Sequence, residues 1–396
     1  MNILVIPSWY PTPERPLHGS FFQEQAQFLN GKEGIEIRVL YGKKKSYPLF
    51  QWIWVYLISF FKKSWVISGE LVQQDPPALG FPFPANRRIP DFLQIDLERR
   101  LFWKAYQSLI RSGWKPDLIH AQSGMDAGIY AHYISSLTKI PFVILEHQVF
   151  VFHYYSKQRA TLVMDAFKAA KKTAAVSYDE RRQVMMNQPA CNPEVIWNLV
   201  NEDNYKIDLE KRNKIFTVVT ILNSLPIKGA VEFLEAMAIV ICRDPSVRFI
   251  MVGKGADENS IHPAENLFVR KSRELEIFDH GEFLPFVPRE KISDVLNQAH
   301  IFVSSTIQEP HGIAVREAMM CGLPVVSTAN GGVEDSIQAQ TGLVVPVRDA
   351  KAMADAILQL KENYQGYSPE NIRAVAVEQC GRLIFKSKMI DFYFNF

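Results

Sequence analysis

Short apolar runs alternate along the whole chain with stretches in which apolar residues recur every three or four positions. The first pattern predicts buried strands and the second amphipathic helices, and their alternation is typical of parallel α/β units. In the first half we expect strands at 2–9, 35–41, 117–121, 141–146, 173–177 and 195–200, and helices at 21–30, 97–112, 128–137 and 180–187. In the second half we expect strands at 216–222, 248–252, 267–270, 301–305, 324–327 and 343–346, a helix at 229–242 and a terminal helix from 369 to about 393.

The polar stretch at 201–214 shows no apolar face and is interpreted as a linker. We therefore expect a first domain at 1–205 that carries an insertion at 43–72, a second domain at 214–375 and a C-terminal helix at 376–396, which either crosses back to pack on the first domain or caps its own domain. Ligands of open α/β sheets bind outside the carboxyl ends of the strands. Two such domains would place a cleft between the carboxyl ends of their sheets.

Composition limits the class of protein. The chain has 396 residues, enough for two full cores, and its four cysteines are far apart with no CxxC, so neither a disulfide framework nor a zinc site is supported and a reducing compartment fits. Residues 1–9 have no basic segment before their apolar core and predict a strand, not a signal peptide.

Residues 1–205 carry 23 Lys and Arg against 18 Asp and Glu, which is too weak an excess for nucleic-acid binding but compatible with an anionic membrane surface. No DxD is present, so the usual carboxylate clamp for a catalytic metal is missing.

The segment Glu309–Val326, EPHGIAVREAMMCGLPVV, is the most informative one. A β-branched strand precedes it, Gly312 breaks that strand, and the following residues have helical spacing up to the stop signal at Gly322. A helix N-terminus beside a glycine presents free N–H groups and suits an anion such as a diphosphate. Carboxylates there, Glu309 and Glu317, would repel phosphates and suit sugar hydroxyls, so the segment predicts a nucleotide-sugar pocket.

The same segment resembles the donor-site signature of the retaining glycosyltransferases of family 4, the glycosyl transferases of group 1. Glu309 and Glu317 fill the carboxylate pair of that signature, and GGVE at 331–334, TGLVVPV at 341–347 and Asp349 follow in the family's order. The resemblance implies a GT-B fold, in which two Rossmann-like domains face each other across a cleft, and a nucleotide-diphosphate sugar as co-substrate with neither cofactor nor metal. It implies that donor contacts come from one set of residues: Gly19, Lys228, Glu309, His311, Gly312, Ile313, Ala314 and Glu317.

Other parts of the chain match the family more loosely. HGSFFQEQA at 18–26 is similar to the family's first-strand loop, and Lys228–Gly229 matches the loop whose Lys reaches the diphosphate, although Asn223 stands where many members have an Arg. The resemblance assigns catalytic roles to His120, Lys228 and Glu309.

On the acceptor side we expect two residues at the ends of strands. His147, in EHQ, is similar to the family's TEH element, and Gln122 stands where many members carry a second His. For His120 and His147, a role as satisfied structural groups remains the alternative.

The insertion contains an apolar run at 52–61 that is far shorter than the ~20 residues needed to span a bilayer. Trp52, Trp54, Tyr56 and Trp65 lie near lysines and suit an interfacial helix on an anionic membrane. The alternative is an insertion folded onto the domain with its aromatic side chains buried.

The leading hypothesis is a metal-independent, retaining hexosyltransferase that uses a nucleotide-diphosphate sugar. The acceptor would be a glycan or lipid-linked glycan in cell-surface polysaccharide synthesis, and the protein would be cytoplasmic with peripheral attachment to the inner face of the plasma membrane. The alternatives are a sugar-nucleotide epimerase or a phosphorylase of the same fold, or a noncatalytic nucleotide-sugar-binding protein, which Asn223 and Gln122 would suit. A dehydrogenase is poorly supported because VGKGAD at 252–257 lacks the third glycine of GxGxxG.

Overall fold

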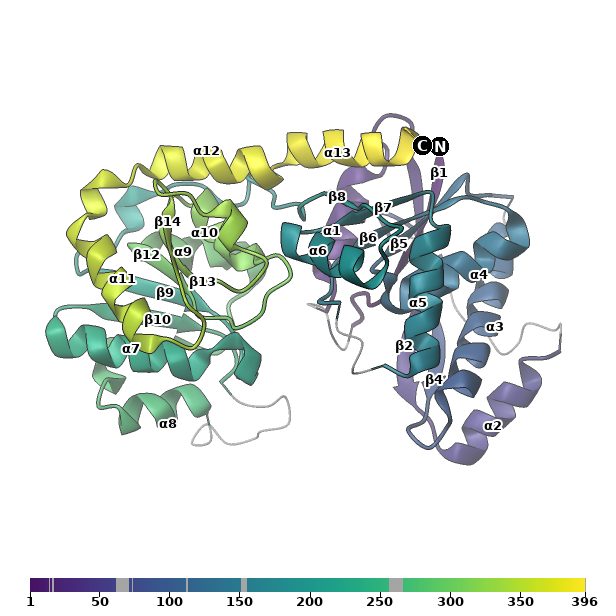
Figure 1. Ribbon diagram of the computed structural model, residues 1–396, viewed down its shortest axis with the longest axis horizontal. Coiled ribbons are helices and arrows are strands. Elements are labelled where there is room, and N and C mark those ends of the chain that lie inside the picture. Colours follow the sequence, from purple (N-terminus) through teal and green to yellow (C-terminus); the bar gives the residue numbers. More distant parts are fainter. Residues whose placement is uncertain are drawn as a thin grey trace. The chain divides into compact units, whose positions relative to one another are not determined.

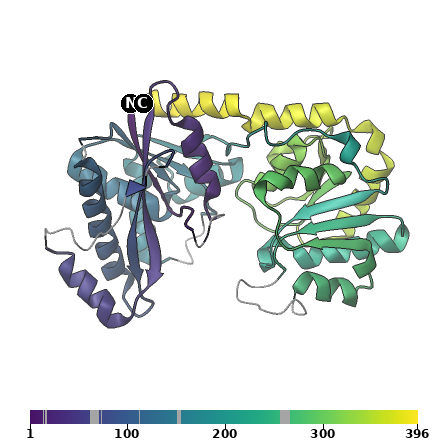
Figure 2. The same cartoon turned by 180° about the vertical axis from the view of Figure 1, so that it is seen from behind.

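The computed structural model describes the chain except for residues 14, 16–17, 62–70, 73, 112, 151–154, 256–265 and 396. The chain divides into two compact units, which are described separately (Figures 1 and 2). Unit 1 comprises Met1–Val176, Glu180–Ile196 and Lys386–Phe396, and unit 2 comprises Ser177–Asp179 and Trp197–Phe385. The last eleven residues therefore group with unit 1, whereas 376–385 group with unit 2.

Unit 1 is built on an eight-stranded sheet of order β3-β4-β2-β1-β5-β6-β7-β8. All neighbouring strands are parallel except β3, which is antiparallel to β4. The strands are β1 (Asn2–Pro7), β2 (Glu36–Ser46), β3 (Leu71–Val72), β4 (Ala78–Ala85), β5 (Leu118–Gln122), β6 (Phe142–Glu146), β7 (Lys172–Ala175) and β8 (Glu194–Val195). The helices that begin in this part of the chain are α1 (Ser20–Leu29), α2 (Leu49–Ile58), α3 (Asp91–Ile110), α4 (Ile129–Thr138), α5 (Lys157–Ala169) and α6 (Tyr178–Asn187).

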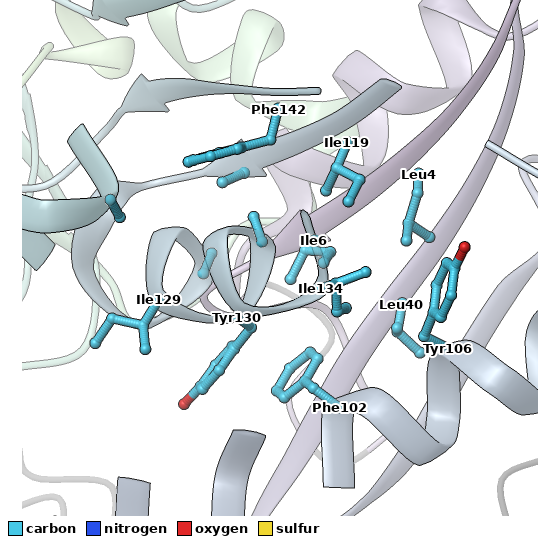
Figure 3. Packing of buried hydrophobic residues seen from close by; sticks show 14 of the residues in the cluster. Leu4, Ile6, Leu40, Phe102, Tyr106, Ile119, Ile129, Tyr130, Ile134 and Phe142 are labelled. Atoms are coloured by element: carbon cyan, nitrogen blue, oxygen red, sulfur yellow. The ribbon is translucent and has the colours of Figure 1, made fainter. Parts of the chain in front are cut away.

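The core of unit 1 lies between this sheet and the helices α3, α4 and α5 (Figure 3). Leu4, Ile6 and Ile119 project from the strands toward Phe102 of α3 and Tyr130 of α4, whose rings stack with centroids 3.9 Å apart. Each such side chain contributes about 1.5–3 kcal/mol through burial. The packing fixes the strand ends from which the candidate site residues project.

Unit 2 contains a six-stranded sheet of order β11-β10-β9-β12-β13-β14, in which every pair is parallel. Its strands are β9 (Thr217–Ile221), β10 (Arg248–Val252), β11 (Gly281–Leu284), β12 (Ile301–Ser304), β13 (Val325–Thr328) and β14 (Gly342–Val345). Its helices are α7 (Ala230–Arg243), α8 (Leu267–Glu274), α9 (Ile292–Gln298), α10 (Ile313–Met320), α11 (Ala350–Glu362) and α12 (Pro369–Cys380), and α13 (Arg382–Phe394) follows. The parallel α/β fold expected from the alternating pattern is confirmed in both units.

Several predicted elements were wrong or missing. The predicted strand at 267–270 belongs to helix α8, because the Asn266 side chain accepts hydrogen bonds from the N–H groups of Phe268 and Val269 and caps a helix. Strand β11 was not predicted. Strand β4 was not predicted, because Pro82 and Pro84 argue against a central strand. Both prolines lie beyond Leu79, where the described pairing of β4 with β3 ends.

Two further corrections concern the predicted linker and the terminal helix. The stretch at 201–214 does have a buried residue, because Tyr205 is 2% exposed and packs in the core of unit 2. The predicted terminal helix is interrupted at Gly381, which separates α12 from α13.

Candidate active site

The candidate donor site lies where the strand order of unit 2 reverses. Strand β9 is flanked by β10 and β12, so the connections that leave β9 and β12 diverge at their carboxyl ends. Ligands of open α/β sheets bind at such a switch point. Lys228 follows β9 and Glu309 follows β12, which places both sequence-predicted residues there.

Lys228 and Glu309 are in direct contact. The Nζ atom of Lys228 lies 2.6 Å from Oε2 of Glu309, and both side chains are partly exposed. Gly229 allows this approach, because it has a φ of 69° and a Cβ atom there would lie 2.0 Å from the carbonyl oxygen of Ser305. The turn that contains Lys228 therefore packs directly against the end of β12.

Gly312 begins helix α10 and turns its N-terminus toward the same carboxylate. Its φ is 74°, a Cβ atom there would lie 2.4 Å from Cγ2 of Val333, and its N–H donates to Oε1 of Glu309 at 3.3 Å. The N–H groups of Ile313 and Ala314 occupy the first helical turn, where no intrahelical acceptor exists. One cation, two backbone donors and one carboxylate thus converge at the start of α10.

Glu317 lies farther along α10 and is held by two side chains that the sequence did not reveal. Its Oε1 atom accepts a hydrogen bond from the hydroxyl of Tyr205 at 2.6 Å and lies 3.5 Å from Nη2 of Arg289. An aromatic residue within an otherwise polar stretch was the only signal for Tyr205. The carboxylate is largely buried, so its orientation is fixed by these contacts.

His311 and Arg316 are buried and stabilise the turn at the start of α10. The Nε2 atom of His311 accepts a hydrogen bond from the N–H of Asn198 at 3.1 Å, and its buried ring forms a T-shaped pair with the ring of Trp197. The Arg316 guanidinium lies 4.2 Å from the ring centre of Trp197 and donates to the carbonyls of His311 and Gly332. Burial lowers the pKa of Arg316 to about 10. The predicted donor role of His311 stays a prediction, since the geometry gives it a positioning contact.

The loop at 331–334 packs against the start of this turn. Glu309 donates its N–H to the carbonyl of Asn330 at 3.0 Å, and the N–H of Gly331 donates to the Glu334 carboxylate at 2.7 Å. A Cβ atom on Gly332 would lie 2.2 Å from the carbonyl oxygen of Glu309, so only glycine permits this packing. The family motif GGVE is therefore explained by backbone contact with the Glu309 turn.

In unit 1 the corresponding switch point lies between β1 and β5, where Pro7 pairs with Gln122. Gly19, with a φ of 78°, packs against Trp9 after β1 and precedes α1. Gln122 is buried and donates to Oε1 of Gln25 at 3.3 Å. His147 is buried against Phe21 and Phe22. The acceptor roles of Gln122 and His147 stay predictions, because the contacts observed for both side chains are with other residues of unit 1.

Glu146 organises the end of strand β6. The carboxylate is fully buried, which raises its pKa, and it accepts hydrogen bonds from Ser123 Oγ, at 2.5 Å, and from the N–H of Gly124, at 2.7 Å. Ser123 has a φ of 80°, which is unfavourable for a residue with a Cβ atom. Glu146 thus stabilises the strained turn after β5, a role that the EHQ motif did not indicate.

His120, predicted to be catalytic, lies beneath the C-terminal helix. Its Nδ1 atom lies 2.8 Å from the hydroxyl of Tyr393 on α13, and the ring is 1% exposed. Burial lowers the pKa of His120 to about 3, so the ring is neutral at physiological pH. These contacts give His120 a packing role, and its catalytic role stays a prediction.

Two family models match adjoining parts of the chain. The model for glycosyl transferases group 1 matches residues 201–376, and the model for Glycosyltransferase Family 4 matches residues 69–204. The matched residues include Lys228, Glu309 and Glu317. The chain belongs to the family 4, group 1 glycosyltransferases. It is therefore an enzyme of sugar transfer.

Curated relatives and solved structures agree with this assignment. TuaC of Bacillus subtilis (strain 168), a glycosyltransferase named for teichuronic acid biosynthesis, is 26% identical over 93% of this chain and 91% of its own length. The D-inositol 3-phosphate glycosyltransferase of Mycobacteroides abscessus is 36% identical over a shorter match, which covers 33% of this chain and 30% of that protein.

Among solved structures, sucrose-phosphate synthase from Thermosynechococcus elongatus superposes with a TM-score of 0.76 at 17% identity, covering 99% of this chain and 98% of that one. Anabaena HepE in complex with UDP superposes with a TM-score of 0.74 at 18% identity, covering 99% of both chains. These likenesses establish the GT-B fold, with its two Rossmann-like domains.

Proposed function

We propose that the protein is a retaining glycosyltransferase that moves a hexose from a nucleotide-diphosphate sugar to a glycan acceptor without a metal ion. The observation that carries this proposal is the contact of Lys228 with Glu309 at the N-terminus of α10. A cation and free N–H groups suit a diphosphate, and a neighbouring carboxylate suits sugar hydroxyls. A donor would separate the pair, with Lys228 turning to the phosphates and Glu309 to the hexose.

In the transfer step the bond between the anomeric carbon and the diphosphate oxygen breaks, and a bond from that carbon to the acceptor oxygen forms. The leaving diphosphate gains negative charge, which Lys228 and the N–H groups of Ile313 and Ala314 would stabilise as preorganised donors. The acceptor proton passes to an oxygen of the leaving phosphate. Attack on the face that the diphosphate leaves would retain the configuration.

The acceptor in this proposal is a glycan or lipid-linked glycan of a cell-surface polysaccharide. TuaC is named for teichuronic acid biosynthesis, and another relative, CapM of Staphylococcus aureus, for capsular polysaccharide biosynthesis. A cytoplasmic location is part of the proposal. It is supported by four free cysteines, three of them buried, which suit a reducing compartment.

Attachment to an anionic membrane surface is also proposed, through helix α2. Phe50, Trp54 and Leu57 recur at helical spacing along α2 and are each more than half exposed. Lys104 of α3 lies near the C-terminal end of α2, where its Nζ donates to the carbonyl of Phe61 at 2.7 Å. Aromatic side chains beside lysines suit a lipid interface. Among the described residues no helix has the length and apolar content to cross a bilayer, so the contact proposed is peripheral.

Trp52, which we had placed on the membrane face, is not part of it. Its side chain is 2% exposed, and its Nε1 donates to Oε1 of Gln94 at 2.8 Å. Tyr56 stacks on Trp52 and donates to Asp96 of α3. These two residues therefore anchor α2 to unit 1, and Trp65 lies outside the described residues.

The test is a turnover assay with UDP-, GDP- and ADP-hexoses in the presence of EDTA, which follows the release of the nucleoside diphosphate. We expect one donor to be consumed and the anomeric configuration of the product, read from its proton NMR coupling constant, to match that of the donor. Glu309→Gln should lower the rate by about 10²–10³-fold, the size of effect typical for loss of one preorganised polar group.

The matched control is Glu235→Gln, because Glu235 also pairs with a lysine in unit 2, Lys271, at 3.6 Å. Its turnover should equal that of the wild type. Inversion of configuration or complete loss of turnover with EDTA would contradict the mechanism. Tight donor binding without turnover for any acceptor would favour the noncatalytic alternative. That alternative has one observation behind it: Asn223, which stands in place of a cation, uses its side chain to accept the N–H of Leu225.

A further inference from the structure

Unit 1 contains a cavity of about 930 Å³ that the proposed donor chemistry does not use. It lies where β2 and β4 end and where α3 and α5 begin, an arrangement that can be followed in Figure 1. Its volume is that of a typical small-ligand site, and its position outside strand ends is the usual one in α/β sheets. Most of the residues that line it have polar or charged side chains.

The floor of the cavity is a fixed array of charged groups around Arg159. Nη2 of Arg159 lies 2.9 Å from Asp91 and 3.0 Å from Glu98, and Nη1 contacts Asp126. Glu98 is fully engaged, since it also accepts from Tyr130 and Gln94. Asp91 and Asp126 differ from it, because each keeps 31% of its side chain exposed.

This array is rigid and carries exposed acceptors. Burial raises the pKa of Glu98, whereas for Asp91 burial is outweighed by hydrogen bonds from Arg159 and Ser156, so the pKa of Asp91 is lowered. Ser156 donates to Asp91 at 2.5 Å and also lines the cavity. Both oxygens of Asp91 accept hydrogen bonds from Arg159 and Ser156, whereas Asp126 contacts Arg159 through Oδ1 alone among the described residues, so its Oδ2 can accept a hydrogen bond from a sugar hydroxyl.

The rim of the cavity carries the opposite charge. Lys44, at the end of β2, and Arg87, after β4, line the cavity and are exposed. Neither forms an ion pair within 4 Å in the part of the chain that the structure describes. Two unpaired cations at the mouth of a pocket suit a carboxylate or a phosphate.

We propose that this cavity binds the acceptor and that the acceptor is an anionic sugar, of which a hydroxyl meets Asp126 and the carboxylate or phosphate meets Lys44 and Arg87. The proposal rests on the proposed glycosyl transfer only for calling the ligand the acceptor. Binding of an anionic sugar at this place can be tested without turnover.

The experiment uses the full chain and three soluble probes: methyl glucoside, methyl glucuronide and glucose 6-phosphate. At low salt, ligand-detected saturation-transfer NMR should show that the charged probes bind roughly tenfold or more tightly than the neutral one. This difference in affinity should become smaller at high salt. The stronger of the two charged probes distinguishes a uronate from a sugar phosphate.

Variants locate the site. Arg87→Gln and Lys44→Gln should each weaken the charged probe by roughly tenfold, as expected for loss of one charge-assisted hydrogen bond, and leave the neutral probe unchanged. Arg88→Gln is the matched control, because Arg88 is the exposed neighbour of Arg87 and does not line the cavity. All three residues are exposed, so melting temperatures should confirm that the variants fold.

Equal affinity for neutral and charged probes, absence of binding for all three, or an Arg88→Gln effect as large as that of Arg87→Gln would each overturn the proposal. Nucleoside diphosphate binding, measured on the same samples, separates the two hypotheses. If the nucleotide binds and no sugar does, only the cavity proposal fails. If charged sugars bind at Arg87 and no nucleotide does, only the donor proposal fails.

Discussion

At the scale of single residues, the donor site depends on positions where a side chain cannot be added. A Cβ atom on Gly229, Gly312 or Gly332 would lie only 2.0, 2.4 or 2.2 Å from the nearest backbone or side-chain atom of a neighbouring residue. Lys228 and Glu309, 81 positions apart, meet because these turns are tight. The chemistry of the pair is thus a consequence of glycine placement.

His120 gives a pH-dependent prediction at this scale. Its folded-state pKa of about 3 lies below the ordinary 6.5, so its contribution to stability is complete above pH 6.5 and is lost as the pH falls from 6.5 toward 3. His120→Asn removes this titration. We expect the variant to be less stable than the wild type at pH 7.5, and the difference to shrink by up to about 1.4 kcal/mol per pH unit below 6.5.

Thermal unfolding of both proteins at pH 7.5, 6.5, 5.5 and 4.5 measures this difference. The half-buried His300, whose pKa burial lowers to about 4, is present in both proteins and cancels in the comparison. A stability difference that stays constant across this range would show that His120 does not titrate as described.

The sequence revealed the site residues unevenly, for physical reasons. Lys228 was predicted from the resemblance to the family, and Glu309 from that resemblance and from its place just before a predicted helix; both follow strands of the parallel sheet of unit 2, whose carboxyl ends lie at one edge. Tyr205 and Arg289 were missed, because their contacts with Glu317 join distant segments and leave no local periodicity. His120 was assigned to chemistry because a sequence cannot show that α13 covers it.

At the scale of elements, regular patterns predicted regular elements. Strand β10 was predicted at its observed bounds, since four consecutive apolar residues follow Arg248 and end at Gly253. The helix at α8 was mistaken for a strand because four residues are too few to distinguish the two periods. The local signal that decides it is Asn266, a helix cap.

Helix α2 carries the prediction at this scale. The variant Phe50→Ser/Trp54→Ser removes two exposed apolar side chains from its outer face and leaves the Trp52 anchor intact. Wild-type protein should float with vesicles that contain phosphatidylglycerol, and the variant should lose most of this binding because buried apolar area drives interfacial attachment. Flotation with neutral vesicles should be weaker.

The matched control is Met186→Ser/Leu383→Ser, which removes two apolar side chains of comparable exposure from other helices. It should float like the wild type. Vesicle binding that survives the Phe50/Trp54 substitutions, or that is lost equally in the control, would rule out α2 as the membrane contact.

At the scale of the whole molecule, two Rossmann-like units divide the proposed tasks. Unit 2 holds the candidate diphosphate site, and unit 1 holds a cavity suited to an anionic sugar. The alternating pattern of the sequence predicted both sheets, since each strand and helix carries its own period. It could not predict the cavity, because Lys44, Arg87 and Arg159 come from three separate segments that only folding brings together.

The central claim, that Lys228 binds a diphosphate, is tested most directly by calorimetric titration of the full chain. The ligands are the nucleoside diphosphate, among UDP, GDP and ADP, that stabilises the protein most, and the corresponding nucleoside. Lys228→Gln should weaken the diphosphate by about 10–100-fold, as expected for loss of one hydrogen bond to a charged group, and leave the nucleoside unchanged. Lys351→Gln, which breaks an exposed ion pair with Asp355 at 2.8 Å, should change neither. Unchanged diphosphate affinity in a folded Lys228→Gln protein, or an equal loss for nucleoside and diphosphate, would contradict the account.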